Sequence, residues 1–102
     1  MKRLEVALHP NAINDLFEIG SHIYRQTGSV ALSRSYTARI REACEKIGTV
    51  PLGGRERSEL GSGVRGWVFE RRAVILYRVT SAGVLVLRIA HRGRHLAALR
   101  LD

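Results

Sequence analysis

The strongest constraint on the fold is a change in the spacing of apolar residues about halfway along the chain. Between residues 10 and 47 the apolar side chains recur every three or four positions, which is the period of an amphipathic helix. From residue 64 to residue 91 they alternate with polar residues or form continuous runs, which is typical of strands. A chain of 102 residues holds one hydrophobic core. We therefore expect a single domain, residues 1–102, in which two helices precede most of a sheet.

The helical half is predicted to form an antiparallel hairpin. The first helix is expected over residues 10–26, because Pro10 suits a first helical turn and Thr27-Gly28 ends the pattern. Ser29 is a suitable cap for the second helix, and Gly48 closes it. So short a linker forces the helices to run antiparallel. Their apolar stripes consist of Ile13, Leu16, Phe17, Gly20, Ile23 and Tyr24 in the first helix, and of Leu32, Tyr36, Ile40, Ala43, Cys44 and Ile47 in the second.

The strand half is predicted to form a meander. "VRGWVFE", "AVILYRVT" and "VLVLRIAH" are joined by tight turns at 70–72 and 81–83, which favours antiparallel neighbours. "RLEVALH" near the N-terminus also alternates and predicts one more strand. We therefore expect an α+β fold in which an N-terminal strand and a three-stranded antiparallel meander complete a four-stranded antiparallel sheet. The helix hairpin would cover one face and leave the other open to a partner.

Several classes of site are disfavoured by the sequence. Cys44 is the only cysteine, so no internal disulfide can form, and its spacing indicates a core position. No Cys/His cluster has the spacing of a zinc site. The glycine-rich loop over residues 51–63 is long enough to suggest function, yet it lacks the Gly-Lys-Ser/Thr order of a phosphate-binding loop. We expect neither a metal nor a cofactor.

The expected location is the cytoplasm. No apolar run approaches the roughly 20 residues of a membrane-spanning helix. "MKRLEVALHP" lacks the apolar region of a signal peptide. We therefore expect a soluble protein with no membrane partner.

The positive charge is concentrated in the second half of the chain. The formal net charge is +8. Residues 1–50 hold seven cationic and five acidic residues, whereas residues 51–102 hold ten arginines and four acidic residues. This excess predicts a polyanion or an acidic protein as partner. A solvated basic surface that only confers solubility is the alternative.

The order of elements, together with several short motifs, resembles the ParE branch of the RelE/ParE superfamily of bacterial toxins. The motifs are "HPNAINDLFEI", "PLGGRERSEL", "GVRGWVF", "VILYRV" and "VLVLRIAHRGRH". Each is short, but their order and spacing together are fairly specific, and they span nearly the whole chain. In "HRGRH" this chain has Gly93, Arg94 and His95 where many ParE-like chains carry an acidic residue soon after the histidine.

The resemblance implies a type II toxin that an adjacent ParD-like antitoxin neutralises. Some ParE-like members poison DNA gyrase, so inhibition of gyrase by direct binding, with nucleic acid contacted only indirectly, is the leading expectation. The RelE-like branch instead cleaves mRNA on the ribosome, which is the first alternative. A basic binding module without toxicity is the second.

The nuclease alternative needs an acid, a base and cations around a phosphate. The cations could include Arg65 and Arg78, but no tyrosine occurs after Tyr77 and neither lysine lies in the predicted sheet. His91 and His95 remain as proton-transfer groups. We therefore expect no enzymatic activity, with these two histidines and two arginines as the candidate catalytic set if the chain is a nuclease.

The candidate target-binding residues lie in and after the predicted sheet. They are Arg65, Trp67, Arg78, Arg88, His91, Arg92 and Arg94. Arg65 and Arg78 alternate with apolar neighbours and are expected on the same open face. Trp67 is either a docking anchor or a core residue. His91 is equally a ligand or a structural residue, and Tyr77 is expected in the core.

A buried arginine within "VLVLRIA" would be costly, so Arg88 should reach either a partner or an internal carboxylate such as Glu42 or Glu59. The basic end and the apolar tail, Leu96, Leu99 and Leu101, are expected to dock onto the target. The candidate antitoxin contacts lie on the helices and are Leu16, Ile23, Tyr36 and Ile40.

Overall fold

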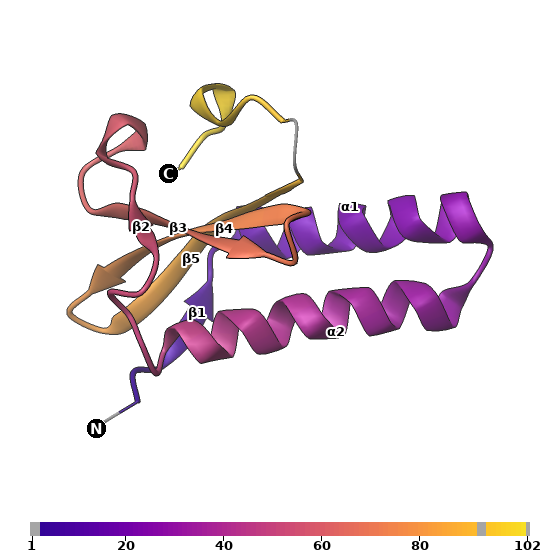
Figure 1. The fold of residues 1–102 in the computed structure, drawn as a ribbon, viewed down its shortest axis with the longest axis horizontal. Helices are drawn as coiled ribbons and strands as arrows, with labels where there is room; N and C mark the ends of the chain where they lie inside the picture. The colour runs from indigo at the N-terminus through magenta and orange to yellow at the C-terminus, as the bar shows by residue number, and fades with distance from the viewer. Residues whose placement is uncertain (1–2, 92–93, 102) are drawn as a thin grey trace.

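A computed structural model describes residues 3–91 and 94–101, with two long helices beside a twisted sheet (Figure 1). In chain order the elements are β1 (Val6–Leu8), α1 (Pro10–Thr27), α2 (Val30–Ile47), β2 (Arg55–Glu56), η1 (Ser58–Leu60), β3 (Val64–Phe69), β4 (Ala73–Thr80), β5 (Gly83–His91) and η2 (Leu96–Ala98). The hairpin extends beyond the end of the sheet, and the C-terminal segment lies over the sheet on the side away from α2 (Figure 1).

The helix hairpin forms where the apolar spacing predicted it. The backbone N–H of Asn11 donates to Nδ1 of His9, which caps the start of α1 at 3.0 Å. Gly28 ends the helix in the left-handed region, with φ of 67°, and its N–H donates to the carbonyl of Tyr24. The Ser29 hydroxyl accepts from the N–H of Leu32 and caps α2 as predicted. Both helices could be predicted from the sequence because each capping residue lies next to the helix end that it caps.

The sheet differs from the prediction in strand number and direction. Its order is β1-β5-β4-β3-β2, so it has five strands. The meander leaves one edge of β5 open, and β1 pairs there in parallel, with Val6 opposite Val84 and Leu8 opposite Val86. The two residues of β2 add an antiparallel edge to β3. The prediction of a four-stranded antiparallel sheet was therefore wrong, because strands of two and three residues carry too little pattern to show their partners.

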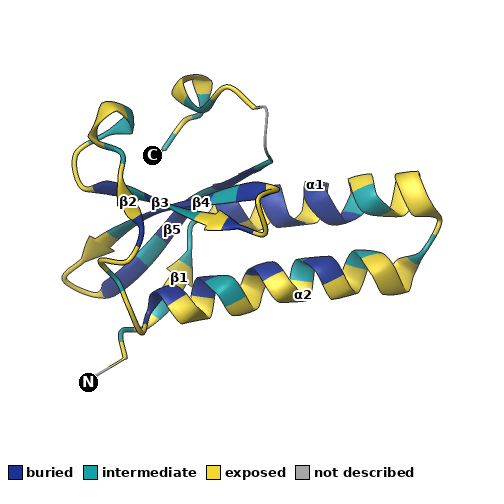
Figure 2. Ribbon diagram, in the orientation of Figure 1, coloured by how far each residue is buried: buried dark blue, intermediate teal, exposed yellow. Residues whose placement is uncertain are grey.

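The main core lies between the helix hairpin and one face of the sheet. Its buried residues include Ile40, Cys44, Ile75, Tyr77 and Val86. Tyr77 has no exposed surface, which confirms its predicted core position. Burial raises the pKa of the Cys44 thiol to about 12, so it stays protonated. Figure 2 shows the buried residues gathered at the sheet and along the adjacent helix faces, whereas the end of the hairpin is exposed.

A second apolar cluster covers the other face of the sheet and changes the role expected of the C-terminal tail. Its buried members are Val64, Leu76 and Leu87, and the tail residues Leu99 and Leu101 pack against them. The tail that was expected to dock onto a target therefore covers this chain's own sheet. Truncation after β5 would expose the apolar surface of this cluster, so it would disturb the fold as well as any contact with a target.

An ion pair joins α1 to the end of β5. The Arg88 guanidinium contacts the Asp15 carboxylate through two hydrogen bonds of 2.8 and 2.9 Å. The same carboxylate accepts the backbone N–H of Ile89 at 2.9 Å. β1 pairs with β5 only as far as Val86, so it does not reach this N–H. Arg88 thus reaches an internal carboxylate, but the suggested partners Glu42 and Glu59 were wrong. The pairing needs the packing of α1 on β5, which spacing alone does not reveal.

Candidate functional site

Arg65 and Arg78 lie on opposite faces of the sheet. In the β3–β4 register Arg65 pairs with Tyr77, whereas Arg78 pairs with Val64. Directly paired residues share a face, and neighbours along a strand point to opposite faces. The expectation that both arginines emerge on one open face was therefore wrong, because a strand's period does not show how it is aligned with its neighbour.

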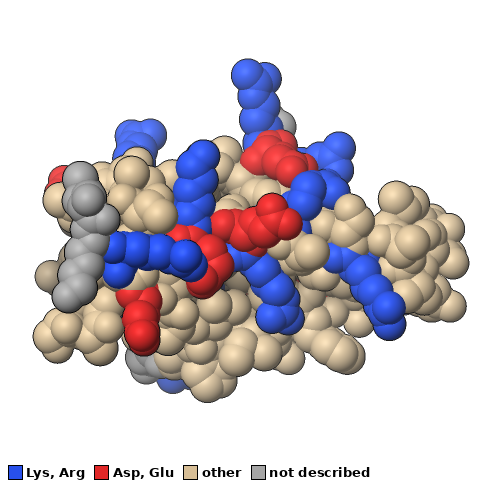
Figure 3. All heavy atoms as spheres, turned by 90° about the horizontal axis from the view of Figure 1, so that it is seen from below, with Lys and Arg blue, Asp and Glu red and all other residues tan. Residues whose placement is uncertain are grey.

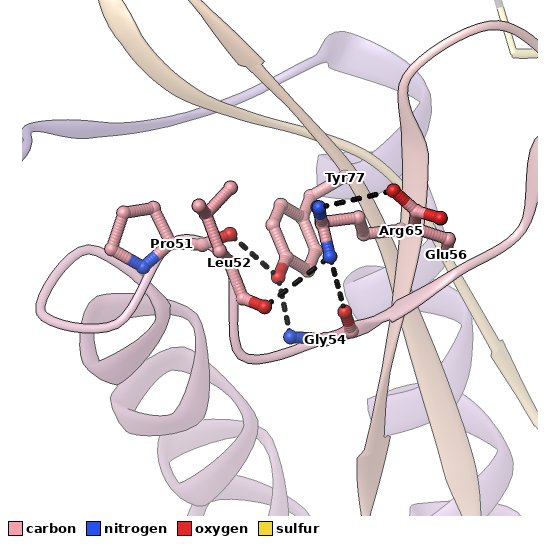
Figure 4. Close-up of polar contacts among 6 residues, drawn as sticks. All are labelled: Pro51, Leu52, Gly54, Glu56, Arg65 and Tyr77. Atoms are coloured by element: carbon pink, nitrogen blue, oxygen red, sulfur yellow. Dashed lines mark hydrogen bonds and ion pairs between the residues drawn. The ribbon is translucent and has the colours of Figure 1, made fainter.

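Arg65 holds the loop that precedes β3. One guanidinium nitrogen donates to the carbonyls of Leu52 at 3.2 Å and Gly54 at 2.9 Å (Figure 4). The other lies 3.4 Å from the carboxylate of Glu56. Arg78 makes a similar contact on its own face, where its Nε donates to the carbonyl of Ser62 at 2.9 Å. Both arginines therefore have structural roles that a substitution would disturb.

The Tyr77 hydroxyl fixes the same loop from the core. It donates to the carbonyl of Pro51 and accepts from the N–H of Gly54, each at 2.9 Å (Figure 4). Tyr77→Phe should lower the free energy of unfolding by about 1–3 kcal/mol, because the buried N–H of Gly54 loses its acceptor. Urea unfolding measures the loss. Tyr24→Phe, at a half-exposed position, is the control and should change little; equal values for the two variants would contradict this role.

Trp67 and His91 line different parts of the sheet. Trp67 is partly buried and packs against the main core. His91 ends β5, where it pairs with Ala73 of β4. His91 and the exposed Arg94 line the same open hollow, together with Leu96. Arg92, the remaining predicted target contact, lies outside the described residues.

The four candidate nuclease residues do not converge. On β4, His91 is paired with Ala73, and Arg65 is paired with Tyr77, which is four residues further along the strand. Arg78 is itself on β4, five residues after Ala73. At ~3.3 Å per residue the groups are roughly 13–17 Å apart along the sheet. His95 lies after β5 and is exposed. The structure therefore brings no acid, base and phosphate-holding cations from this set to one point.

The predicted antitoxin contacts are mostly inside the core. Leu16, Tyr36 and Ile40 are buried, and Ile23 is half-buried against the same cluster. The spacing of the stripes was correct, but each stripe is wider than the face that the sheet covers. The residues at its outer edge are therefore the accessible ones.

Those outer residues form a surface that we call the hairpin groove, an open cavity of about 560 Å³ between α1 and α2. It is lined by Ile13, Leu16, Phe17, Gly20, Ser21, Tyr24, Arg25, Val30, Ser33, Arg34, Thr37 and Arg41. Phe17 is 75% exposed, and Ile13, Tyr24 and Val30 are each at least half exposed. The floor is tight, since the Ser33 hydroxyl donates to the carbonyl of Gly20 at 2.7 Å.

The charges near the hairpin groove are arginines. Arg25, Arg34 and Arg41 line it, and no acidic residue is part of its lining in the described chain. Figure 3 shows one face of the molecule, on which charges of both signs mix over the body while the end of the hairpin is mostly uncharged. The groove thus combines exposed apolar side chains with positive charge, which suits a segment bearing apolar and acidic residues.

The comparison with known families decides the classification. The family described as ParE toxin of type II toxin-antitoxin system, parDE, matches residues 6–96, from β1 to the start of η2. The chain belongs to the ParE toxin family. A search of curated protein sequences found no match.

A solved structure has the same fold as this chain. The chain is similar to a chain of the chromosomal ParDE toxin–antitoxin system from P. aeruginosa, with 23% sequence identity and a TM-score of 0.76. The match covers 87% of this chain and 96% of that chain. The fold is thus shared across most of both chains.

Among residues 3–91 and 94–101, no three His, Cys, Asp or Glu side chains gather where they could hold a metal ion. Neither long helix in this part of the chain is apolar enough to span a membrane.

Proposed function

We propose that this ParE-family chain is a toxin that a ParD-like antitoxin neutralises by occupying the hairpin groove. The observation that carries the proposal is the groove itself, where exposed Phe17 and its apolar neighbours meet three arginines. Such apolar side chains in water favour a partner that buries them. The ParDE name of the similar structure supports a ParD-like occupant.

We further propose that the target is DNA gyrase, inhibited by direct binding and without catalysis by this chain. The candidate acid–base and phosphate-holding residues are spread along the sheet, which disfavours a ribonuclease. A binding inhibitor needs affinity and geometry rather than proton transfer. The exposed Arg94, which lines the same hollow as His91, is the candidate docking point. The proposed location is the cytoplasm, where gyrase works.

A supercoiling assay with purified gyrase tests this target. The full chain should inhibit supercoiling at micromolar concentration. Arg94→Glu should weaken inhibition severalfold, and more at low salt than at high salt, because salt screens exposed charges. Arg34→Glu is the control, since it changes the same charge in the hairpin groove; it should retain inhibition of gyrase and instead weaken antitoxin binding.

Two results would contradict gyrase as the target. Site-specific mRNA cuts on purified ribosomes that disappear with His91→Ala or His95→Ala would establish the ribosome-dependent nuclease. Absence of both gyrase inhibition and mRNA cleavage, with antitoxin binding retained, would favour the non-toxic binding module.

A further inference from the structure

The sheet face that the C-terminal tail covers is left uncovered at one end. Val64, at the start of β3, is buried in the second apolar cluster. Val68 lies four residues later on the same strand and therefore on the same face, yet it is 68% exposed. Its partner on β4 is Val74, which packs against the second cluster. The apolar face thus continues beyond the part that the tail covers.

The uncovered end of this face forms an open hollow of about 350 Å³ that we call the sheet-face hollow. It is lined by Val68, Arg71, Ala73, Val74, His91, Arg94 and Leu96. Its aliphatic side chains Val68, Val74 and Leu96 come from β3, β4 and η2. His91 also lines a cavity on the helix side of the sheet, together with Tyr36. A concave apolar surface of this kind can bury an apolar side chain of a partner.

The permanently charged residues of the sheet-face hollow are arginines. Arg71 and Arg94 line it, and both are exposed. Among the described residues its lining contains no carboxylate. Glu18 of α1 shares a neighbouring cavity with Arg94, but in the described part of the chain the two form no ion pair. Positive charge therefore lies beside apolar surface, and the complementary partner is an acidic segment that carries an apolar side chain.

The turn that carries Arg71 adopts a conformation that its residues disfavour. The N–H of Arg72 donates to the carbonyl of Phe69 at 2.8 Å, which closes a two-residue turn. The two turn residues, Glu70 and Arg71, have φ of 47° and 58°, where Asn and Gly are ordinarily found because other side chains are strained. Arg39 of α2 holds the turn through hydrogen bonds of 2.9 and 3.3 Å to the Glu70 carboxylate. That carboxylate is therefore engaged on α2, and it is not part of the lining of the sheet-face hollow.

We propose that the sheet-face hollow docks an acidic segment of the protein target, which inserts one apolar side chain against Val68 and Val74 and places carboxylates beside Arg94. The docking site rests on the proposed function, inhibition of the target by direct binding, and adds the chemistry that the target must present. The sheet-face hollow shares no lining residue with the hairpin groove, so the target and the antitoxin are given separate sites.

Two other occupants fit the sheet-face hollow less well. A nucleic-acid strand offers phosphates to the arginines but no aliphatic side chain to the valines, and the described lining holds no Phe, Tyr or Trp on which a base could stack. A second copy of this chain, placed hollow to hollow, would bring arginines against arginines in molecules of formal net charge +8. An acidic protein segment suits both the apolar and the charged part of the surface.

The first test uses a probe that does not depend on gyrase. The full chain is titrated, with NMR detection, with a short synthetic peptide in which one leucine is flanked by aspartates. The methyl signals of Val68, Val74 and Leu96 should shift, because the docked leucine lies against them. A peptide with serine in place of leucine, and one with asparagines in place of the aspartates, should each bind about tenfold more weakly. No shift with the first peptide, or equal binding of all three, would overturn the docking site whatever the result with gyrase.

The second test compares variants of the chain with the peptide and with gyrase. Val68→Asp should abolish the peptide-induced shifts and raise the concentration needed for half-inhibition of supercoiling at least about tenfold. Val68→Thr keeps the branched side chain that suits a strand and should weaken both effects about threefold, so the test remains decisive if the aspartate variant does not fold. Leu52→Asp is the matched control and should change neither, because Leu52 is also 68% exposed but does not line the sheet-face hollow.

The two tests distinguish failure of the docking site from failure of the proposed target. Gyrase inhibition that neither Val68→Asp nor Val68→Thr weakens would overturn the sheet-face hollow as the docking site and leave gyrase as the target. Peptide binding at the hollow without gyrase inhibition would overturn gyrase and support an acidic protein segment as the occupant.

Three results would assign the sheet-face hollow to another occupant and overturn the proposal. The first is a shift of the same methyl signals by a single-stranded oligonucleotide and not by the peptide. The second is a dimer of the free chain, seen by sedimentation, that Val68→Asp dissociates. The third is a loss of antitoxin affinity in Val68→Asp as large as its loss of gyrase inhibition.

Discussion

Phe17→Asp is expected to lower the affinity for the ParD-like antitoxin by at least about 100-fold, which corresponds to the loss of a central contact of about 2.7 kcal/mol. Phe17 is the most exposed large apolar residue of the chain's described part, at 75%, and it lines the hairpin groove. A carboxylate there would have to lose its water to be covered by an apolar segment. Isothermal titration calorimetry with the proposed ParD-like antitoxin measures the effect.

Leu32→Asp is the matched control for Phe17→Asp. Leu32 is also an exposed apolar residue of the hairpin, at 55%, but it does not line the hairpin groove. Both variants should keep the unfolding free energy of the unchanged chain, because neither side chain is in the core. Equal loss of affinity in the two variants, or none in either, would move the antitoxin site away from the groove.

Asp15→Ala is expected to lower the free energy of unfolding by about 3–5 kcal/mol, the largest stability effect we predict for a single substitution. It would leave the largely buried Arg88 guanidinium without its counter-ion and the N–H of Ile89 without an acceptor. Total stability of a domain this size is about 5–15 kcal/mol, so the variant should be close to unfolding. Urea unfolding followed by circular dichroism measures the change.

Two further variants show whether the loss of unfolding free energy comes from the unpaired charge of Arg88. Asp15→Asn keeps an acceptor of similar size and should lose less than Asp15→Ala. The double variant Asp15→Leu with Arg88→Met removes both charges and should also lose less, since replacing a buried pair by apolar residues is often neutral. A double variant as unstable as Asp15→Ala would show that packing and not charge is responsible.

Arg88 also links the two faces of the molecule. Besides Asp15 on α1, its guanidinium contacts the carbonyl of Arg100 in the C-terminal tail at 3.2 Å. The tail lies on the far face of the sheet, against the second cluster. Loss of Asp15 should therefore also loosen the tail, and hydrogen exchange at residues 94–101 would report this.

The helices and the meander could be predicted from the sequence. Pro10, Gly28 and Ser29 are caps whose effects act on neighbouring residues, and the predicted helix bounds agree with α1 and α2 within one or two residues. The tight turns made β3, β4 and β5 an antiparallel meander. In both cases the decisive contacts are close in sequence.

The functional surface was harder to predict. The apolar stripe of α1 included both Leu16 and Phe17, yet the first is buried and the second is mostly exposed. Periodicity gives the side of a helix that faces the core, but the edge of that face depends on where the sheet ends and how closely the helices pack at Gly20 and Ser33. The hairpin groove therefore has no separate signal in the sequence.

By itself the sequence determined the α+β class, a helix hairpin and an antiparallel meander, because periods and caps are local properties of the chain. Only the tertiary structure decided that β1 pairs in parallel with β5, that Arg88 meets Asp15, and that the tail covers the sheet. It also separated Arg65 from Arg78 and joined Tyr36 to His91 at one cavity. These contacts join segments remote in the chain, and their geometry depends on register and packing, which no local pattern encodes.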